Sequence, residues 1–330
     1  MQEALYYQAT KDAVLCYLCP HFCRLKTGET GLCGVRQAKG KKLYTLNYGL
    51  CAALASDPIE KKPLYHFYPG QQILSVGTVG CNLDCGFCQN WQLARASAET
   101  MYTRKTPLQL MEMLTAIKPS VMGIAYTYSE PGMWYEFVRE TAQLVHQHGL
   151  KNVLVTNGYL NLEPLRALLP FIDAFNIDVK AFTNDFYQDH CAGRLQPVLR
   201  YVEEAAAVSH VELTYLVVPS LNDNENEVRR FADWVADINP KIPVHFTRYY
   251  PQHRFRQPAT PVSTLEKLRE IALRKLQYVY LGNIPTQMTA HTMCPSCGEI
   301  LVLRDGYKII NKVKDGLCPY CRQPAEIMNA

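Results

Sequence analysis

The sequence lacks a long apolar segment. None of its apolar runs reaches the roughly 18 residues that a membrane-spanning helix needs. The N-terminal stretch MQEALYYQATKDAV contains acidic residues and has no continuous apolar region, so it does not resemble a secretion signal. We therefore expect a cytoplasmic protein that has no membrane partner.

The chain also carries little net charge. Its 34 basic and 30 acidic residues give a formal charge of +4, and no expected helix shows a basic stripe. Nothing here indicates a polyanionic partner, and binding to nucleic acid is not expected. At 330 residues, with 48% apolar and 19% charged residues, the chain can form one large core and one or two small modules.

Cysteine, in contrast, is abundant. Cys51 and Cys191 stand alone and are expected to be small buried hydrophobic residues. In a long chain without a secretion signal, clustered cysteines indicate metal ligands rather than disulfides. The other cysteines of the thirteen fall into three groups: Cys16, Cys19, Cys23 and Cys33; Cys81, Cys85 and Cys88; Cys294, Cys297, Cys318 and Cys321.

The central part of the chain alternates between two patterns. Short β-branched runs predict strands, helix-period segments between them predict helices, and this order predicts a parallel sheet with crossover helices. No Gly-x-Gly-x-x-Gly turn follows a strand, which favours an α/β fold of the partial or closed (β/α) barrel type. Strands are expected over 73–79, 121–128, 152–158, 174–182, 210–219, 243–250 and 278–282, and helices over 106–117, 131–149, 162–170, 195–208, 224–238 and 262–276.

Polar residues gather where these strands end. The first strand runs into Gly80 and a cysteine loop, and later strands run into TYSEP (127–131), TNG (156–158) and DVK (178–180). In a parallel barrel the C-terminal ends of the strands form the active face. We therefore expect the functional site there.

The loop VGTVGCNLDCGFCQNW (76–91) offers three thiols and no fourth ligand nearby. A structural zinc ion would be closed by four ligands. An iron–sulfur cluster held by three cysteines would instead leave one iron free for a substrate or cofactor. The spacing of Cys81, Cys85 and Cys88 therefore favours a cluster with an open corner.

This motif, with Phe87 at its aromatic position, resembles the signature of the radical S-adenosylmethionine (SAM) superfamily. CQNW resembles the CHN of pyruvate formate-lyase activating enzymes. The stretches CPHFC, DPIEKKPLYHFYPG and AYTYSEP are similar to AmmeMemoRadiSam-type enzymes, and the resemblance covers nearly the whole chain. It implies a radical SAM partial barrel that binds a [4Fe-4S] cluster and SAM. It further implies reductive cleavage of SAM to a 5′-deoxyadenosyl radical that abstracts hydrogen.

The resemblance also implies partners. A flavodoxin- or ferredoxin-type protein would donate the electron. The substrate would be a partner protein, as for activating enzymes, or else a small molecule. A separate alternative, compatible with the cysteine knuckles and 21 tyrosines, is a zinc-dependent module that binds nucleic acid or protein and uses all its metals structurally.

Several site residues follow from the resemblance. Glu130 would accept a hydrogen bond from the SAM amine, Phe87 would pack on the adenine, and Asp178 and Lys180 match a DxK motif near SAM. The chain has YSE where activating enzymes have GGE, and VTNG where they have DTNG, so Thr156 or Asn157 would replace the ribose-binding aspartate. The simpler alternatives are a helix-start charge for Glu130, an ion pair for Asp178 and Lys180, and core aromatics for Phe87 and Trp91.

The two flanking cysteine groups predict small modules. CPSC and CPYC around a hairpin over 301–313 are typical of a zinc ribbon, in which Cys294, Cys297, Cys318 and Cys321 close a tetrahedron; rubredoxin-like iron is the alternative. Cys16, Cys19, Cys23 and Cys33 would hold structural zinc or an auxiliary iron–sulfur cluster. We thus expect an N-terminal cysteine-rich module over 1–70, a barrel over 71–285 and a zinc-ribbon-like module over 286–330.

Overall fold

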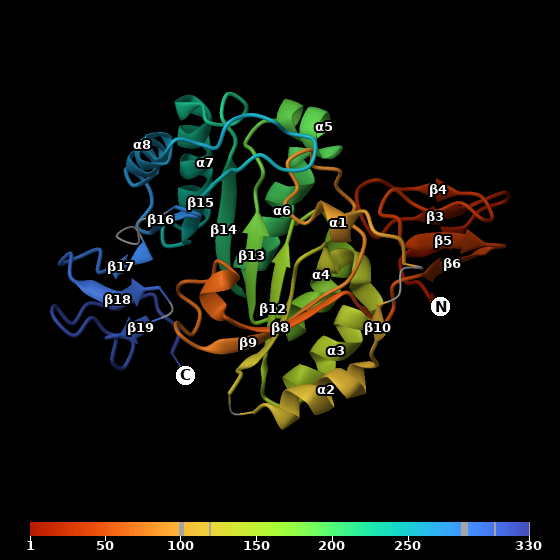
Figure 1. Cartoon of the computed structure of the whole chain (residues 1–330), viewed down its shortest axis with the longest axis horizontal. Helices are drawn as coiled ribbons and strands as arrows, with labels where there is room; N and C mark the ends of the chain where they lie inside the picture. The colour runs from red at the N-terminus through yellow and green to blue at the C-terminus, as the bar shows by residue number, and fades with distance from the viewer. Residues whose placement is uncertain (99–101, 119, 285–289, 307, 330) are drawn as a thin grey trace.

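The computed structural model describes residues 1–98, 102–118, 120–284, 290–306 and 308–329. Its central feature is one eight-stranded sheet (Figure 1). Neighbouring strands are parallel except for the pair at one edge, where β8 runs antiparallel to β9. In order across the sheet the strands are β16 (Val279–Gly282), β15 (Val244–Arg248), β14 (His210–Val217), β13 (Ala174–Asp178), β12 (Lys151–Thr156), β11 (Gly123–Tyr126), β9 (Gln72–Gly77) and β8 (Ala53–Pro58).

Helices connect the parallel strands and cover the sheet. In α6, for example, Val198, Tyr201, Val202 and Ala205 are buried at a helical spacing, which gives the helix one apolar face. The α-helices are α1 (Trp91–Ala94), α2 (Pro107–Ala116), α3 (Tyr135–Gln147), α4 (Leu162–Leu168), α5 (Asn184–Cys191), α6 (Leu195–Ala206), α7 (Glu225–Ile238) and α8 (Val262–Ala272). Short 3-10 turns are η1 (Ile59–Lys61), η2 (Pro131–Trp134) and η3 (Leu169–Phe171).

The sheet confirms the predicted partial parallel barrel. Its two edge strands, β16 and β8, do not pair with each other in the described part of the chain, so the barrel stays open. All seven expected strands and six expected helices are present with shifted ends. The prediction missed three elements. The sequence of β8 is irregular, α1 is only four residues long, and α5 is rich in polar residues.

The N-terminal segment forms small antiparallel sheets beside the barrel. They share one continuous hydrophobic core with it, which includes Val35 and Val79. One strand within residues 1–70, β8, belongs to the main sheet. The expected domain boundary between the N-terminal module and the barrel at residue 70 stays a prediction. The strands are β1 (Gln2–Glu3), β2 (Tyr7–Ala9), β3 (Val14–Cys16), β4 (Arg24–Leu25), β5 (Arg36–Lys39), β6 (Lys42–Thr45) and β7 (Leu50–Cys51), the last paired with β10 (Thr103–Arg104).

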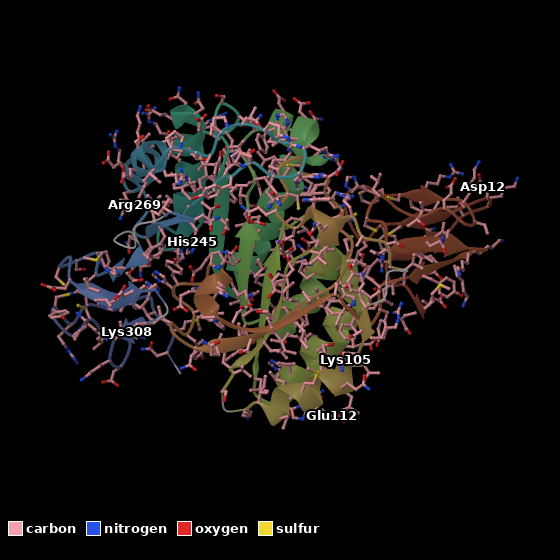
Figure 2. The ribbon with its side chains drawn as sticks, in the orientation of Figure 1. Asp12, Lys105, Glu112, His245, Arg269 and Lys308 are labelled. Atoms are coloured by element: carbon pink, nitrogen blue, oxygen red, sulfur yellow. The ribbon has the colours of Figure 1, made fainter. Side chains whose placement is uncertain are left out.

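The C-terminal segment lies on the opposite side of the barrel from the N-terminal sheets (Figure 1). It contains β17 (Thr292–Met293) and the expected hairpin of β18 (Ile300–Asp305) and β19 (Lys308–Asn311). Arg304 joins it to the barrel, because Nη2 donates to the Tyr65 carbonyl at 2.5 Å and the guanidinium lies over the Tyr65 ring. Figure 2 labels Lys308 in this segment, where β19 begins with an exposed side chain.

A buried carboxylate fixes the barrel end at which the strands begin. Glu212 on β14 accepts hydrogen bonds from the backbone N–H groups of Tyr65 and His66 at 2.9 and 2.7 Å. It also lies 2.7 Å from Nε2 of His245, which Figure 2 labels on the sheet. These contacts stabilise the segment that enters β9 and leave the opposite end of the barrel free. None of the described helices has the length and apolar character to cross a membrane.

Candidate active site

A cavity of about 340 Å³ opens at the C-terminal ends of the strands. Its size lies within the range of ligand-binding pockets, near the lower end. The residues that the sequence singled out for this site all line it: Cys81, Cys85, Phe87, Cys88, Glu130, Thr156, Asn157, Asp178 and Lys180. They come from strands far apart in the sequence, which the parallel sheet brings to one face.

The cysteine loop is held in place from both sides. The backbone N–H of Asp84 donates to the Cys191 carbonyl at 2.8 Å, and that of Gly86 donates to the His190 carbonyl at 3.1 Å, so the end of α5 supports it. From the other side, the N–H of Arg254 donates to the Gly86 carbonyl at 2.9 Å. The loop therefore keeps its shape through main-chain contacts with two distant segments.

The thiol spacing fits a cluster better than a single ion. Within the described part of the chain, one group of His, Cys, Asp or Glu brings its ligand atoms within 4.8 Å of one another, and it is the C-terminal cysteine group. The thiols of Cys81, Cys85 and Cys88 line a common cavity without meeting that spacing. Ligands of a cubane bind different iron atoms and lie farther apart than ligands of one ion, so the wider spacing is compatible with a [4Fe-4S] cluster.

A fourth cysteine lies near the loop without reaching the cavity. Cys191 at the end of α5 is fully buried, as expected for a small hydrophobic residue, and it is not among the residues that line the cavity. Its thiol interacts with Cys85, and this contact together with burial raises the pKa of Cys85 well above the usual range. No local sequence pattern indicates this proximity, because 106 positions separate the two residues.

Glu130 is a buried polar group of the cavity with three hydrogen-bond donors around it. It precedes η2, and its carboxylate accepts hydrogen bonds from the backbone N–H of Gly132, the Thr156 hydroxyl and the backbone N–H of Asn157, each at 2.8 Å. Burial raises its pKa to about 7, although these hydrogen bonds act in the opposite direction. The Gly132 contact is the helix-start role that the simpler alternative expects, and the carboxylate also faces the cavity.

Thr156 and Asn157 therefore position Glu130. Asn157 has three further contacts: its Nδ2 donates to Oδ1 of Asn82 at 2.9 Å and lies 3.6 Å from Sγ of Cys81, and its Oδ1 accepts from the backbone N–H of Tyr159 at 2.8 Å. An amide donor next to a cluster ligand is one of the means by which proteins tune iron–sulfur potentials.

Asp178 and Lys180 form an ion pair inside the cavity. Nζ of Lys180 lies 2.7 Å from Oδ2 of Asp178. Burial alone would lower the pKa of Lys180, but the charge of Asp178 and its hydrogen bond to Lys180 act against burial, and the pKa of Lys180 lies above the usual range. Lys180 thus remains a cation, and the pair is both an internal ion pair and part of the cavity wall.

Aromatic residues form the rest of the wall. Phe87 is 2% exposed and packs on Phe186 and Phe255, with ring centroids 5.7 and 5.5 Å apart, so it is a core aromatic that also reaches the cavity. Trp91 is only half-buried, contrary to the core role considered for it. Its ring stacks on His253 at 5.0 Å and 15°, and both residues line the cavity. The sequence did not single out His253.

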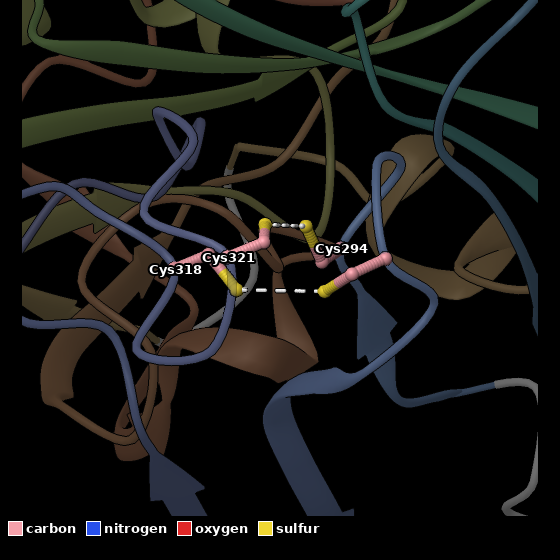
Figure 3. A group of neighbouring side chains, drawn as sticks. Cys294, Cys318 and Cys321 are labelled. Atoms are coloured by element: carbon pink, nitrogen blue, oxygen red, sulfur yellow. Dashed lines mark hydrogen bonds between the residues drawn. The ribbon is translucent and has the colours of Figure 1, made fainter.

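The C-terminal cysteines form a separate candidate metal centre. Sγ of Cys294 lies 3.6 Å from that of Cys321, and Sγ of Cys297 lies 3.7 Å from that of Cys318, as Figure 3 shows. Thiolates that surround one zinc ion at about 2.3 Å would lie about 3.8 Å apart at the corners of a tetrahedron. The four side chains are therefore arranged for a single metal ion.

Comparisons with known proteins indicate the same class of enzyme as the residues of the cavity. Residues 75–235 match the family model of the radical SAM superfamily. The chain is 40% identical to the uncharacterized protein MJ0808 of Methanocaldococcus jannaschii, over 99% of this chain and 100% of that one. It is 24% identical to the pyruvate formate-lyase-activating enzyme of Clostridium pasteurianum, over 52% of this chain and 72% of that one.

A solved structure shares the fold. SuiB of Streptococcus suis bound to S-adenosylmethionine aligns with a TM-score of 0.53 at 12% identity, over 72% of this chain and 56% of that one. The chain belongs to the radical SAM superfamily and is related to pyruvate formate-lyase-activating enzymes. It is thus a radical SAM enzyme, of the class that cleaves SAM with a [4Fe-4S] cluster; the AmmeMemoRadiSam subtype stays a prediction.

Proposed function

We propose that Cys81, Cys85 and Cys88 hold the [4Fe-4S] cluster and that the enzyme abstracts a hydrogen atom from a segment of a partner protein. The cavity supports the first part, since it gathers the three thiols, a carboxylate and a charged lysine on one face. When bound, the cluster and SAM supply one-electron cleavage of the sulfonium to methionine and a 5′-deoxyadenosyl radical. A flavodoxin- or ferredoxin-type protein supplies the electron.

The side chains of this chain bind and orient SAM. Glu130 accepts a hydrogen bond from the amino group, and its fixed position comes from Thr156 and Asn157. Lys180 faces the carboxylate of SAM, and its ion pair with Asp178 keeps the Lys180 ammonium charged. Phe87 contributes an apolar surface for the adenine and keeps water from the reacting atoms.

The size of the cavity favours a substrate that approaches from outside. Pockets for drug-sized ligands measure about 300–1,000 Å³, and at about 340 Å³ this cavity lies near the lower end of that range, which favours one bound molecule at a time. The rim carries side chains that solvent can reach, among them Gln89 and Asn283. A protruding segment of a partner protein fits this arrangement, and the kinship with activating enzymes is consistent with it. A small-molecule substrate is the alternative.

The C-terminal cysteines are proposed to hold structural zinc. Four thiolates in a tetrahedron leave no position for substrate. They also connect segments whose own buried core is small. A rubredoxin-like iron ion has the same ligands and is the alternative.

The proposal is tested by anaerobic incubation with dithionite and SAM, followed by quantification of 5′-deoxyadenosine. Wild-type protein should form it, and Cys85→Ala should neither bind cluster iron nor form it. Glu130→Gln should raise the SAM concentration at half-maximal rate by roughly 10- to 100-fold, because a charge-assisted hydrogen bond contributes about 1.5–3 kcal/mol.

Glu163→Gln is the matched control, since Glu163 is exposed on α4 and remote from the cavity lining. Iron-free protein after reconstitution would contradict the cluster and favour a binding module. Candidate proteins and small molecules are then compared by whether they accelerate the release of 5′-deoxyadenosine.

A further inference from the structure

A second cysteine group converges in the N-terminal module. Cys16 ends β3, Cys19 and Cys23 lie in the turns before β4, and Cys33 precedes β5. All four line one small cavity. Gly31 lies at its wall, where an added Cβ would stand 3.6 Å from Sγ of Cys23 and 3.8 Å from Sγ of Cys33. The thiols therefore face a common centre although up to 17 positions separate them in the sequence.

The N-terminal thiols are more widely spaced than those of the C-terminal group. Among the described residues they do not meet the 4.8 Å spacing that the C-terminal group meets. In this respect they resemble Cys81, Cys85 and Cys88, which likewise share a cavity at longer separations. One chain thus contains a compact set of four thiols and two wider sets, and the wider spacing suits a cluster with several iron atoms.

The surroundings suit a negatively charged group. Arg36 is 1% exposed, and its Nη1 lies 3.6 Å from Sγ of Cys16. Its Nε is buried and finds no acceptor within the described ranges. Glu136 forms an ion pair with the same guanidinium from α3 and fixes its position. A cluster with four thiolate ligands is anionic, so a buried cation next to one ligand stabilises it.

This group also touches the cysteine loop of the active site. Gly80, which precedes Cys81, has a φ of +94°, and an added Cβ would stand 2.9 Å from the Cys33 carbonyl oxygen and 2.6 Å from Cγ1 of Val35. A second contact runs from Nε2 of His21, between Cys19 and Cys23, to the carbonyl oxygen of Asn82 at 2.7 Å. The segments that carry the two cysteine groups are therefore in direct contact at two places.

We propose that Cys16, Cys19, Cys23 and Cys33 bind an auxiliary iron–sulfur cluster that passes electrons to the active-site loop. One electron from a flavodoxin- or ferredoxin-type donor reduces the auxiliary cluster, and the same electron then reduces the cluster at Cys81, Cys85 and Cys88. No bond forms or breaks in this transfer. The transfer depends on the proposed function, whereas the presence of the auxiliary cluster does not.

The first experiment leaves the N-terminal cysteines intact. A Cys81→Ala/Cys85→Ala/Cys88→Ala variant of the full chain is reconstituted anaerobically, and iron, sulfide and zinc are quantified. We expect about four iron and four sulfide, or about two of each for a two-iron cluster, per chain. Adding Cys16→Ala/Cys19→Ala to this variant should remove the remaining iron and sulfide. Adding Cys51→Ala instead should leave the iron and sulfide in place. Iron without sulfide, or a second zinc in place of iron, would overturn the cluster.

The second experiment tests the transfer. Cys16→Ala/Cys19→Ala protein that retains the active-site cluster should form 5′-deoxyadenosine with dithionite at a rate close to wild type. It should be at least tenfold slower with reduced flavodoxin. Equal rates relative to wild type with both reductants would overturn the relay. If wild-type protein forms no 5′-deoxyadenosine with either reductant, the proposed function is contradicted. The iron and sulfide result of the first experiment is independent of this outcome.

Discussion

Nδ2 of the Asn157 side chain lies 3.6 Å from Sγ of Cys81, and the backbone N–H of Asn157 donates to the Glu130 carboxylate. Removing the side chain in Asn157→Ala should lower the reduction potential of the cluster, since a donor near a ligating sulfur stabilises the reduced, more negative state. A hydrogen bond of about 1 kcal/mol corresponds to roughly 40 mV for one electron.

Anaerobic spectroelectrochemistry measures this shift. Asn226→Ala, at an exposed position on α7, is the matched control and should leave the potential unchanged. An unchanged potential in Asn157→Ala would show that the amide does not interact with the cluster.

The raised pKa of Glu130 predicts pH-dependent binding of SAM. Because burial raises the pKa of Glu130 above its usual range to about 7, the side chain is a carboxylate above pH 7 and becomes a neutral acid below it. Affinity for SAM should therefore fall as the pH is lowered through 7, by up to about tenfold per pH unit. Titration calorimetry of the reconstituted, unreduced protein between pH 6 and 7.5 checks this. Glu130→Gln should show weak binding without this pH dependence, and the same slope in both proteins would exclude Glu130 as its source.

Gly80 joins the N-terminal module to the cysteine loop and should not tolerate a side chain. Its φ of +94° disfavours any Cβ, and the added atom would meet Val35 and the Cys33 carbonyl at less than 3 Å. Gly80→Ala should lower the free energy of unfolding by about 2 kcal/mol or more and reduce the iron content. Gly34→Ala is the control, because Gly34 has a φ of +73° with open space around it. Its cost should be limited to about 1 kcal/mol. Equal costs in thermal unfolding would show that the contact with the module is unimportant.

The position of Cys191 predicts that it is not a cluster ligand. It lies next to Cys85 but does not line the cavity. Cys191→Ala should therefore keep the iron content of wild type, whereas Cys88→Ala should lose the iron of the active-site cluster. Iron analysis together with the visible spectrum measures both. Loss of iron in Cys191→Ala to the level of Cys88→Ala would indicate a fourth protein ligand and a closed cluster.

The C-terminal metal should stabilise its own module only. Cys294→Ser should lose about one zinc per chain and leave the iron unchanged, since the two sites lie on different parts of the barrel. Hydrogen exchange should accelerate in β18 and β19 but not in β9. Faster exchange in both regions would show that the module supports the barrel.

The sequence predicted the barrel because its buried parallel strands are continuous β-branched runs, as in "NVLVTNG" at β12. It also predicted the cavity, because strand ends share one face and a cysteine motif marks it. The antiparallel β8 contains Ala, Ser, Asp and Pro, so its pairing depends on β9 rather than on its own propensity. The contacts of Cys191 with Cys85 and of His253 with Trp91 arise from tertiary folding, and no local pattern records them.

Arg254 bonds to Gly86 through its backbone and to Asp84 through its side chain, across 170 positions of sequence in the latter case. During synthesis, the cysteine loop therefore leaves the ribosome long before the segment that fixes it. Until α5 has been made the loop lacks both supports, and until Arg254 follows it is held on one side only. Assembly of the cluster is thus expected to occur late, once three quarters of the chain has been made.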